Sequence, residues 1–267
     1  GLKIQVSTVR FRLEPPLWQL KHIYLCFFLL FLKNLKKEKE KSFLRHHYIY
    51  VTSKGGFKME DKTLLYFRNP YQFKNFIIEL GVYNGWKIES GLMNDRGAAI
   101  SNRGYSKRLK EIFAEKKLYH KNVSVAEIVS WLDTFVHVDR ILGELISNQD
   151  DSVIQNIEVY IEYKIEMAKL ARVDCMFKFG KKYCLLEFRT VNKFERMKSA
   201  YEKKRIELMI YKDLMENYIE HPAKIVVFPF IGLFEYDENR LVKEHYENNV
   251  KTAKYAAEYI SKYILKK

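Results

Sequence analysis

Between residues 157 and 166, apolar and polar side chains alternate along the chain. A period of two is typical of a strand with one buried and one exposed face, and the exposed face would carry Glu158 and Glu162. Residues 223–230 (AKIVVFPF) are almost entirely apolar, which predicts a strand inside a sheet. The two stretches together indicate a sheet with a substantial buried surface.

Residues 171–189 (ARVDCMFKFGKKYCLLEFR) predict a β-hairpin with a two-residue turn that begins at Gly180. This turn sets the register and places Asp174 directly opposite Glu187, with both side chains on the same face. A shift of one residue would set charged positions against apolar ones. The other face is apolar, because the same register pairs Val173 with Phe188, Cys175 with Leu186, and Phe177 with Cys184.

Apolar residues recur at helical spacing in several other stretches. The clearest start signal is Ser124, an expected N-cap, with Glu127 completing a capping box. Residues 91–104 are rich in Gly and Asn and predict a loop. Helices are predicted at residues 69–85, 105–119, 124–147, 195–219 and 248–267.

The order of the predicted elements is a helix, three strands, a helix, a strand and a final helix. This order predicts an α/β or α+β domain around a mixed sheet flanked by helices. We expect a helical N-terminal region at 59–123 and the main domain at 124–267.

The first 58 residues differ from the rest in charge. They contain 12 Lys and Arg against 3 Asp and Glu, whereas residues 59–267 contain 35 against 30. The net charge of +14 therefore lies mostly outside the main domain, and it is weak evidence for an anionic partner. The cysteines form no metal-binding spacing, and their odd number favours a reduced, cytoplasmic protein. They are Cys26, Cys175 and Cys184.

The segment 1–58 contains an apolar run, Ile23–Leu32, that is shorter than the roughly 20 residues needed to cross a bilayer. Residues 53–59 (SKGGFKM) back-translate into a purine-rich stretch just before a start codon, which resembles a bacterial ribosome-binding site. We therefore interpret 1–58 as a non-native leader or a disordered extension, with Met59 as the native start and no membrane contact. The alternatives are an ordinary linker and a membrane anchor.

Two opposed carboxylates repel each other, so a fold retains them where something positive lies between them. Arg172 and Arg189, predicted to oppose each other on the same face, would give a ladder of ion pairs. A divalent cation is the second possibility, because Mg²⁺ binds one or two carboxylates together with water and phosphate oxygens.

The spacing of Asp174 and Glu187-Phe188-Arg189 resembles the D-x(n)-(D/E)-x-K signature of the PD-(D/E)xK phosphodiesterases, in particular the RecB-like branch. That branch carries a Q-x-x-x-Y motif on the following helix, and this chain has Glu207 and Tyr211 at that spacing. The similarity covers about residues 125–230.

The resemblance implies a restriction-endonuclease-like core of order α-β-β-β-α-β-α and a metal-dependent deoxyribonuclease. It implies that Asp174, Glu187 and the backbone carbonyl of Phe188 hold Mg²⁺ or Mn²⁺. Glu144, on the preceding helix, would be an additional ligand, although a solvated helix carboxylate is an equal interpretation. The activated water would attack a DNA phosphodiester in repair, recombination, defence or a mobile element.

The family usually places lysine where this chain has Arg189. A guanidinium stays protonated and therefore cannot act as a general base, although it can bind phosphate; Lys193 would be the substitute. Further contacts to nucleic acid are expected from Lys203, Lys204, Glu207 and Tyr211. The alternatives are surface exposure for the lysines, and contact with the active-site lysine or helix docking for Glu207 and Tyr211.

Two other functions remain open from the residues alone. One is a catalytically inactive relative that binds nucleic acid, with Arg189 marking the loss of activity. The other is a structural or partner-binding domain. His137 lies in an apolar stretch and is interpreted as a core residue. The sequence contains no motif of P-loop nucleotide hydrolases, zinc proteases of the H-E-x-x-H type or esterases of the G-x-S-x-G type.

Overall fold

The computed structural model describes residues 59–80, 103–116, 123–165, 171–217, 222–238 and 240–266. The chain divides into two units after Phe57, and the second unit is Lys58–Lys267. The predictions for residues 1–58, and for most of the loop at 91–104, lie outside the described residues.

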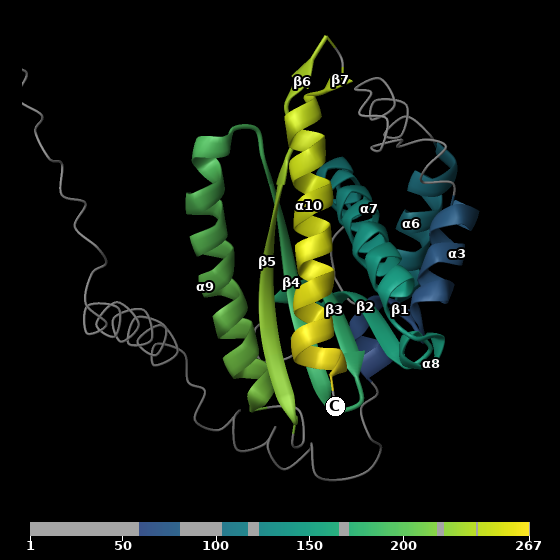
Figure 1. Cartoon of the computed structure of the whole chain (residues 1–267). Helices are drawn as coiled ribbons and strands as arrows, with labels where there is room; N and C mark the ends of the chain where they lie inside the picture. Colours follow the sequence, from purple (N-terminus) through teal and green to yellow (C-terminus); the bar gives the residue numbers. More distant parts are fainter. Residues whose placement is uncertain are drawn as a thin grey trace, which may run out of the picture. The chain divides into compact units, whose positions relative to one another are not determined.

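A five-stranded sheet in the order β1-β2-β3-β4-β5 forms the centre of the second unit (Figure 1). Its first four strands pair antiparallel, and β4 pairs with β5 in parallel. The predicted class, a mixed sheet flanked by helices, is confirmed. The strands are β1 (Thr63–Phe67), β2 (Ile157–Lys164), β3 (Arg172–Phe179), β4 (Lys182–Val191) and β5 (Lys224–Leu233).

Helices cover both faces of the sheet (Figure 1). On one face α7 and α10 pack together, and α3 packs against α7; α9 lies on the other face, against β4 and β5. The long helices are α3 (Pro70–Leu80), α6 (Arg103–Lys116), α7 (Val125–Asn148), α9 (Met197–Glu216) and α10 (Lys243–Ile260). The short elements are η1 (Met59–Lys62), α8 (Asp151–Ile154), η2 (Phe194–Arg196), β6 (Tyr236–Asp237), β7 (Arg240–Leu241) and η3 (Ser261–Leu265).

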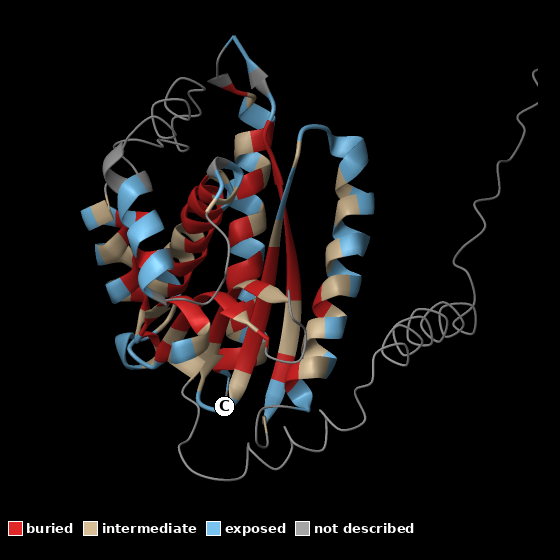
Figure 2. Cartoon of the chain, turned by 180° about the vertical axis from the view of Figure 1, so that it is seen from behind, coloured by how far each residue is buried: buried red, intermediate tan, exposed pale blue. Residues whose placement is uncertain are grey.

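Two hydrophobic clusters stabilise this three-layer arrangement. The larger one joins Trp131 and Phe135 of α7 to Phe177 of β3, and the smaller one joins Leu185 of β4 to Leu208 of α9. Burial is concentrated on the strands and on the inward sides of the helices, whereas the outer side of α9 is exposed (Figure 2). The sheet is therefore buried on both faces, and a charged residue on it costs free energy unless it is paired.

The predicted hairpin register is confirmed over five pairs, from Phe179–Lys182 to Cys175–Leu186. Gly180 occupies the turn with φ +59°, a left-handed conformation that glycine adopts without steric cost. Beyond the pair Cys175–Leu186, β3 and β4 no longer pair with each other. There β3 stays paired with β2, and β4 stays paired with β5. The predicted pairings of Arg172 with Arg189 and of Val173 with Phe188 are therefore wrong. Val173 belongs to the cluster with α9, whereas Phe188 packs against the cluster with α7.

The predicted single buried face of β2 is also wrong. Ile161 belongs to the cluster that contains α7, whereas Tyr163 belongs to the cluster that contains α9. The side-chain alternation reverses at Glu162, which has φ +56° although it is not glycine. A left-handed conformation in a strand costs a non-glycine residue roughly 1–2 kcal/mol, so the surrounding contacts must hold it there.

Several boundaries differ from the sequence predictions. The region 59–123, expected to be helical, also contains β1, which pairs with β2 at the edge of the sheet. The last helix begins at Lys243 rather than at residue 248. The capping box of α7 is present, since the backbone N–H of Glu127 donates to the Ser124 hydroxyl at 3.2 Å and the backbone N–H of Ser124 donates to the Glu127 carboxylate at 3.0 Å. Among the described residues, no helix is long and apolar enough to cross a bilayer.

Candidate active site

Asp174 and Glu187 lie side by side where β3 and β4 part. The backbone N–H of Asp174 donates to Oε1 of Glu187 at 3.1 Å, and the backbone N–H of Phe188 donates to Oδ2 of Asp174 at 2.8 Å. In each bond a side-chain carboxylate accepts from a backbone N–H, as a backbone carbonyl of the facing strand does in a regular ladder. These two bonds replace the backbone pairing that β3 and β4 lack at this point. The two acids predicted from the hairpin are brought together by this exchange.

Lys204 of α9 supplies the positive charge next to this pair. Its Nζ lies 2.6 Å from Oε2 of Glu187 and 2.9 Å from Oε2 of Glu207. The hydroxyl of Tyr211 donates to Oε1 of Glu207 at 2.8 Å. Because residues three, four and seven apart share one side of a helix, α9 presents Lys204, Glu207 and Tyr211 together to the sheet. The Glu207–Tyr211 pair thereby holds the lysine against Glu187.

The site raises the pKa of both acids. Glu187 has only 1% of its surface exposed, and burial followed by the negative charge of Asp174 raises its pKa well above the usual range. Burial also raises the pKa of Asp174, while Lys204 and the Phe188 N–H oppose the shift. A pair of interacting carboxyl groups of this kind favours binding a proton or another cation.

Lys204 keeps its charge in this setting. Burial alone lowers its pKa, but the negative charge of Glu187 and its hydrogen bond raise the pKa by more, as do Asp174 and Glu207. The net pKa is raised, so Lys204 is an ammonium ion at neutral pH. It can stabilise negative charge but cannot accept a proton.

A third carboxyl group adjoins the pair on β2. Glu162, predicted to be exposed, is buried with 6% of its surface accessible. Its Oε2 lies 2.9 Å from Nη1 of Arg172, and Nη2 of Arg172 lies 3.6 Å from Oε1 of Glu127. Burial and the charge of Asp174 raise the pKa of Glu162 to about 8, although Arg172 opposes the rise. Arg172 therefore binds Glu162 and Glu127 instead of forming a ladder with the central acids.

Glu158, the other acid expected on an exposed face of β2, is half-buried in a network of its own. Its carboxylate accepts from the hydroxyl of Tyr66 at 3.2 Å and from the ammonium of Lys178. Lys178 neutralises the charge of Glu158, and Tyr66 adds a hydrogen bond. Glu158 thus has partners apart from the Asp174–Glu187 pair, and its role is structural.

Several predicted site residues lie elsewhere. Glu144 is 17 positions after Glu127 on α7, which places it roughly 25 Å further along the helix axis. It is Glu127, in the first turn, that reaches the site through Arg172. Lys193 is exposed in the turn after β4, beyond Val191, and is not brought to the carboxylates.

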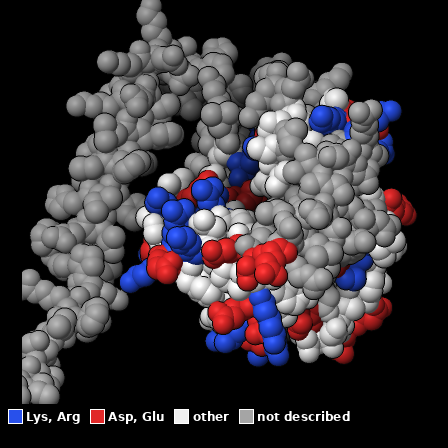
Figure 3. Space-filling view, turned by 90° about the horizontal axis from the view of Figure 1, so that it is seen from above, with Lys and Arg blue, Asp and Glu red and all other residues white. Residues whose placement is uncertain are grey.

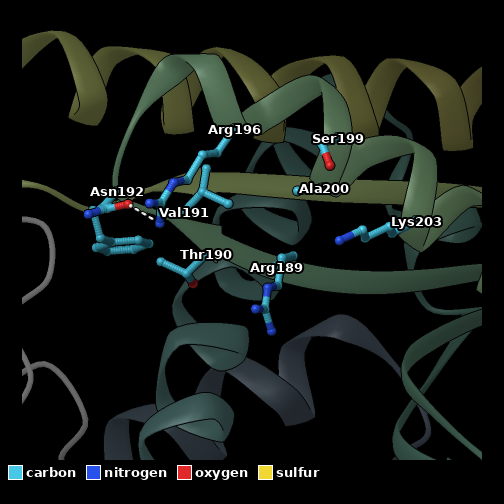
Figure 4. Close-up of a pocket in the computed structure, with 9 residues that line it drawn as sticks. Arg189, Thr190, Val191, Asn192, Arg196, Ser199, Ala200 and Lys203 are labelled. Carbon is cyan, nitrogen blue, oxygen red and sulfur yellow. Dashed lines mark hydrogen bonds between the residues drawn. The ribbon is translucent and has the colours of Figure 1, made fainter.

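Arg189 and Lys203 line a cavity of about 680 Å³ between the end of β4 and the start of α9 (Figure 4). Arg189 also lines a second, smaller cavity of about 230 Å³ on the other side of β4, where His137 packs against the rings of Phe188 and Phe230. His137 is buried, as expected of a core residue.

The oxygen atoms of Asp174 and Glu187 match the ligands that Mg²⁺ or Mn²⁺ prefers. Within the described residues, no three His, Cys, Asp or Glu side chains come together as a metal-binding group. A divalent cation here would thus be held by two carboxylates and would complete its shell with water and substrate oxygens. The observation that favours such a cation is the placement of two buried acids side by side. Burial raises the pKa of both, and the charge of Asp174 raises that of Glu187 further, so a cation between them would offset buried negative charge.

Comparison of the chain with models of known protein families found no match, and comparison with curated proteins found none either.

Proposed function

We propose that this chain is a metal-dependent phosphodiesterase that cleaves nucleic acid, with Asp174 and Glu187 at its centre. The observation that carries the proposal is the pair itself: two adjoining acids with raised pKa values at the point where two central strands part. In the alternative, a structural ladder of ion pairs, each acid would be paired with an arginine. The nearby Arg172 binds Glu162 and Glu127 and not the two central acids.

The proposed architecture is a restriction-endonuclease-like core formed by α7, β2, β3, β4, α9, β5 and α10. The resemblance of the hairpin motif to PD-(D/E)xK phosphodiesterases supports this proposal, and so does the position of both acids on neighbouring strands. DNA as the substrate and the cytoplasm as the location stay predictions from the sequence.

Asp174 and Glu187 would hold Mg²⁺ or Mn²⁺ in this proposal. When bound, the ion supplies Lewis-acid chemistry, which polarises the phosphodiester and lowers the pKa of water. The chain's own residues position this chemistry: the backbone N–H groups of Asp174 and Phe188 fix the two carboxylates. The side chains are held by the fold before substrate binds, so little reorganisation is needed.

Lys204 takes the electrostatic role that the family's third motif position usually has. Arg189 cannot accept a proton, and the raised pKa of Lys204 excludes it as a base as well. Its ammonium group, held by Glu207 and Glu187, stabilises the negative charge that develops on the phosphate during attack. Arg189, two positions after Glu187 on the same strand, binds a phosphate oxygen.

A second candidate function is nucleic-acid binding without cleavage. The observation that favours it is the 2.6 Å ion pair between Lys204 and Glu187, which already neutralises one of the acids within the chain. The two candidates share the anionic ligand and differ in the need for a divalent cation.

A cleavage assay with labelled single- and double-stranded DNA and RNA separates the candidates. The wild type is expected to cleave at least one of them with Mg²⁺ or Mn²⁺ and not in EDTA. Asp174→Asn and Glu187→Gln should each reduce the rate by about 100-fold or more, because each removes several kcal/mol of electrostatic stabilisation.

Matched controls are Asp213→Asn on α9 and Glu258→Gln on α10, both at exposed positions. These controls should cleave at the wild-type rate. Wild-type activity in Asp174→Asn, or no cleavage with either metal, would contradict the proposed function. Binding of nucleic acid without cleavage would select the second candidate.

A further inference from the structure

A basic cavity lies between the end of β4 and the start of α9 (Figure 4). It measures about 680 Å³, and its lining contains Arg189, Arg196 and Lys203 but no Asp or Glu. In the part of the chain that the structure describes, none of these three cations forms an ion pair. Viewed from above, Lys and Arg side chains gather on the side of the molecule where α9 lies, with acidic side chains beside them (Figure 3). The cavity therefore carries a concentrated positive charge.

The lining also offers neutral hydrogen-bonding groups. Nη1 of Arg196 donates to Oδ1 of Asn192 at 3.2 Å, which orients the guanidinium at one end of the cavity (Figure 4). The hydroxyl groups of Thr190 and Ser199 belong to the same lining. The first turn of α9 contains no acidic residue, and the helix dipole adds positive charge at this end. Arginine forks, a lysine and hydroxyl donors together suit a phosphate group.

The position of the cavity relates it to the acids. Arg189 lies two residues after Glu187 on β4, which is about 7 Å along the strand. Lys203 directly precedes Lys204 on α9. Neither acid lines the cavity, which lies further along β4 than Glu187, toward the end of the strand. The spacing along β4 is comparable to one nucleotide of a strand.

We infer that this cavity binds a backbone phosphate of a nucleic-acid strand, one nucleotide away from the phosphodiester at the Asp174–Glu187 pair. The inference rests on the proposed function and adds the direction in which the strand runs, along β4 toward the start of α9. Contacts of this kind are independent of base sequence and position the strand for cleavage.

The test is binding of a fluorescein-labelled 15-nucleotide single-stranded DNA in EDTA, where no metal-dependent cleavage occurs. Fluorescence anisotropy at several KCl concentrations gives the affinity and its salt dependence. The double variant Arg196→Gln/Lys203→Gln should bind at least tenfold more weakly. Its plot of log affinity against log salt should be shallower by about 0.7, the contribution of one neutralised phosphate in a single strand.

The matched control is Arg205→Gln/Lys251→Gln, which removes the same charges at exposed positions outside the cavity. It should bind like the wild type, and thermal unfolding should show that both double variants fold. Parallel titrations with an RNA of the same sequence, and competition by inorganic phosphate, distinguish a strand from a free anion. The strand is expected to bind, and millimolar phosphate to compete only weakly.

Equal affinity and salt slope in the cavity variant and the wild type overturn the inference, and so does a wild type that binds no oligonucleotide. Displacement of the strand by low micromolar phosphate also overturns it, because the cavity would then be a site for the free anion. If the wild type cleaves nucleic acid while the cavity variant binds normally, only this inference fails. If the cavity variant binds weakly but no metal supports cleavage, only the proposed phosphodiesterase activity fails.

Discussion

Glu162→Gln tests the electrostatics around the active-site acids through protein stability. Glu162 is buried with an unfavourable left-handed backbone, and its carboxylate faces Arg172 at 2.9 Å. Glutamine has the same shape as a protonated glutamate and retains a side-chain oxygen that can face Arg172. The substitution therefore removes the charge and little else.

The expected magnitude follows from the pKa of Glu162, which rises from 4.5 to about 8 on folding because of burial and the charge of Asp174. The folded state holds the proton more tightly than the unfolded state does. The protonated form of Glu162 therefore favours the folded state. Its contribution to the free energy of unfolding is complete below about pH 4.5 and is lost as the pH rises through about 8. Between pH 5 and pH 8 the wild type should lose about 3–4 kcal/mol from this group alone, at about 1.4 kcal/mol per pKa unit.

The assay is urea unfolding at pH 5, 6.5 and 8, followed by circular dichroism. At pH 5 the variant and the wild type should have similar free energies of unfolding, and at pH 8 the variant should be more stable by a few kcal/mol. A control, Glu258→Gln, changes an exposed acid and should show no such pH-dependent gain. If Glu162→Gln is equally or less stable than the wild type at pH 8, the charge is well tolerated and the reasoning is refuted.

Three further predictions concern single features of the fold. Lys204→Met should lower the free energy of unfolding by about 3–5 kcal/mol at pH 8, because it leaves Glu187 without its cation, and by less at pH 5; urea unfolding at both values checks this. Cys175 and Cys184 should not react with a thiol reagent in the folded protein, because burial raises the pKa of both thiols, and rapid labelling without denaturant would contradict it. Ser124→Ala should destabilise the fold by about 1 kcal/mol through loss of the α7 cap, and an unchanged unfolding midpoint would show that the cap contributes nothing.

Local patterns in the sequence predicted much of the fold. The turn at Gly180 and the apolar residues on one face of the hairpin were sufficient to set the β3–β4 register, which the structure confirms over five pairs. The capping box at Ser124 marked the start of α7. These predictions succeeded because each depends on residues close together in the chain.

Features that depend on distant residues could not be predicted. Strand β1 has only five residues and owes its place to pairing with β2, almost 100 positions later. The reversal of side-chain alternation at Glu162 has no signal in the alternating pattern, which continues unbroken through that residue. The contacts that accompany the reversal form only in the folded chain, where Arg172 of β3 contacts both Glu162 and Glu127 of α7.

For the candidate site, the sequence indicated the two acids but not the partner of Glu187. Lys204 was expected to contact nucleic acid, with an exposed surface position as the alternative, because it stands in a run of basic residues. The signal that distinguishes it is its spacing with Glu207 and Tyr211 on α9, of which the Q-x-x-x-Y motif includes only the last two residues. Its contact with Glu187 needs the docking of α9 on the sheet, and that is a tertiary feature.

The most direct test of the central claim is calorimetric titration of the folded protein with Mn²⁺ at pH 7, in two buffers with different ionisation enthalpies. Because the acids hold protons more tightly than isolated carboxyl groups do, a cation that binds between them should displace protons. We predict saturable binding with proton release in the wild type, and its loss in Asp174→Asn and Glu187→Gln but not in Asp213→Asn. Saturable binding that persists unchanged in Glu187→Gln, or no binding to the folded wild type, would contradict the assignment of these two acids as a cation site.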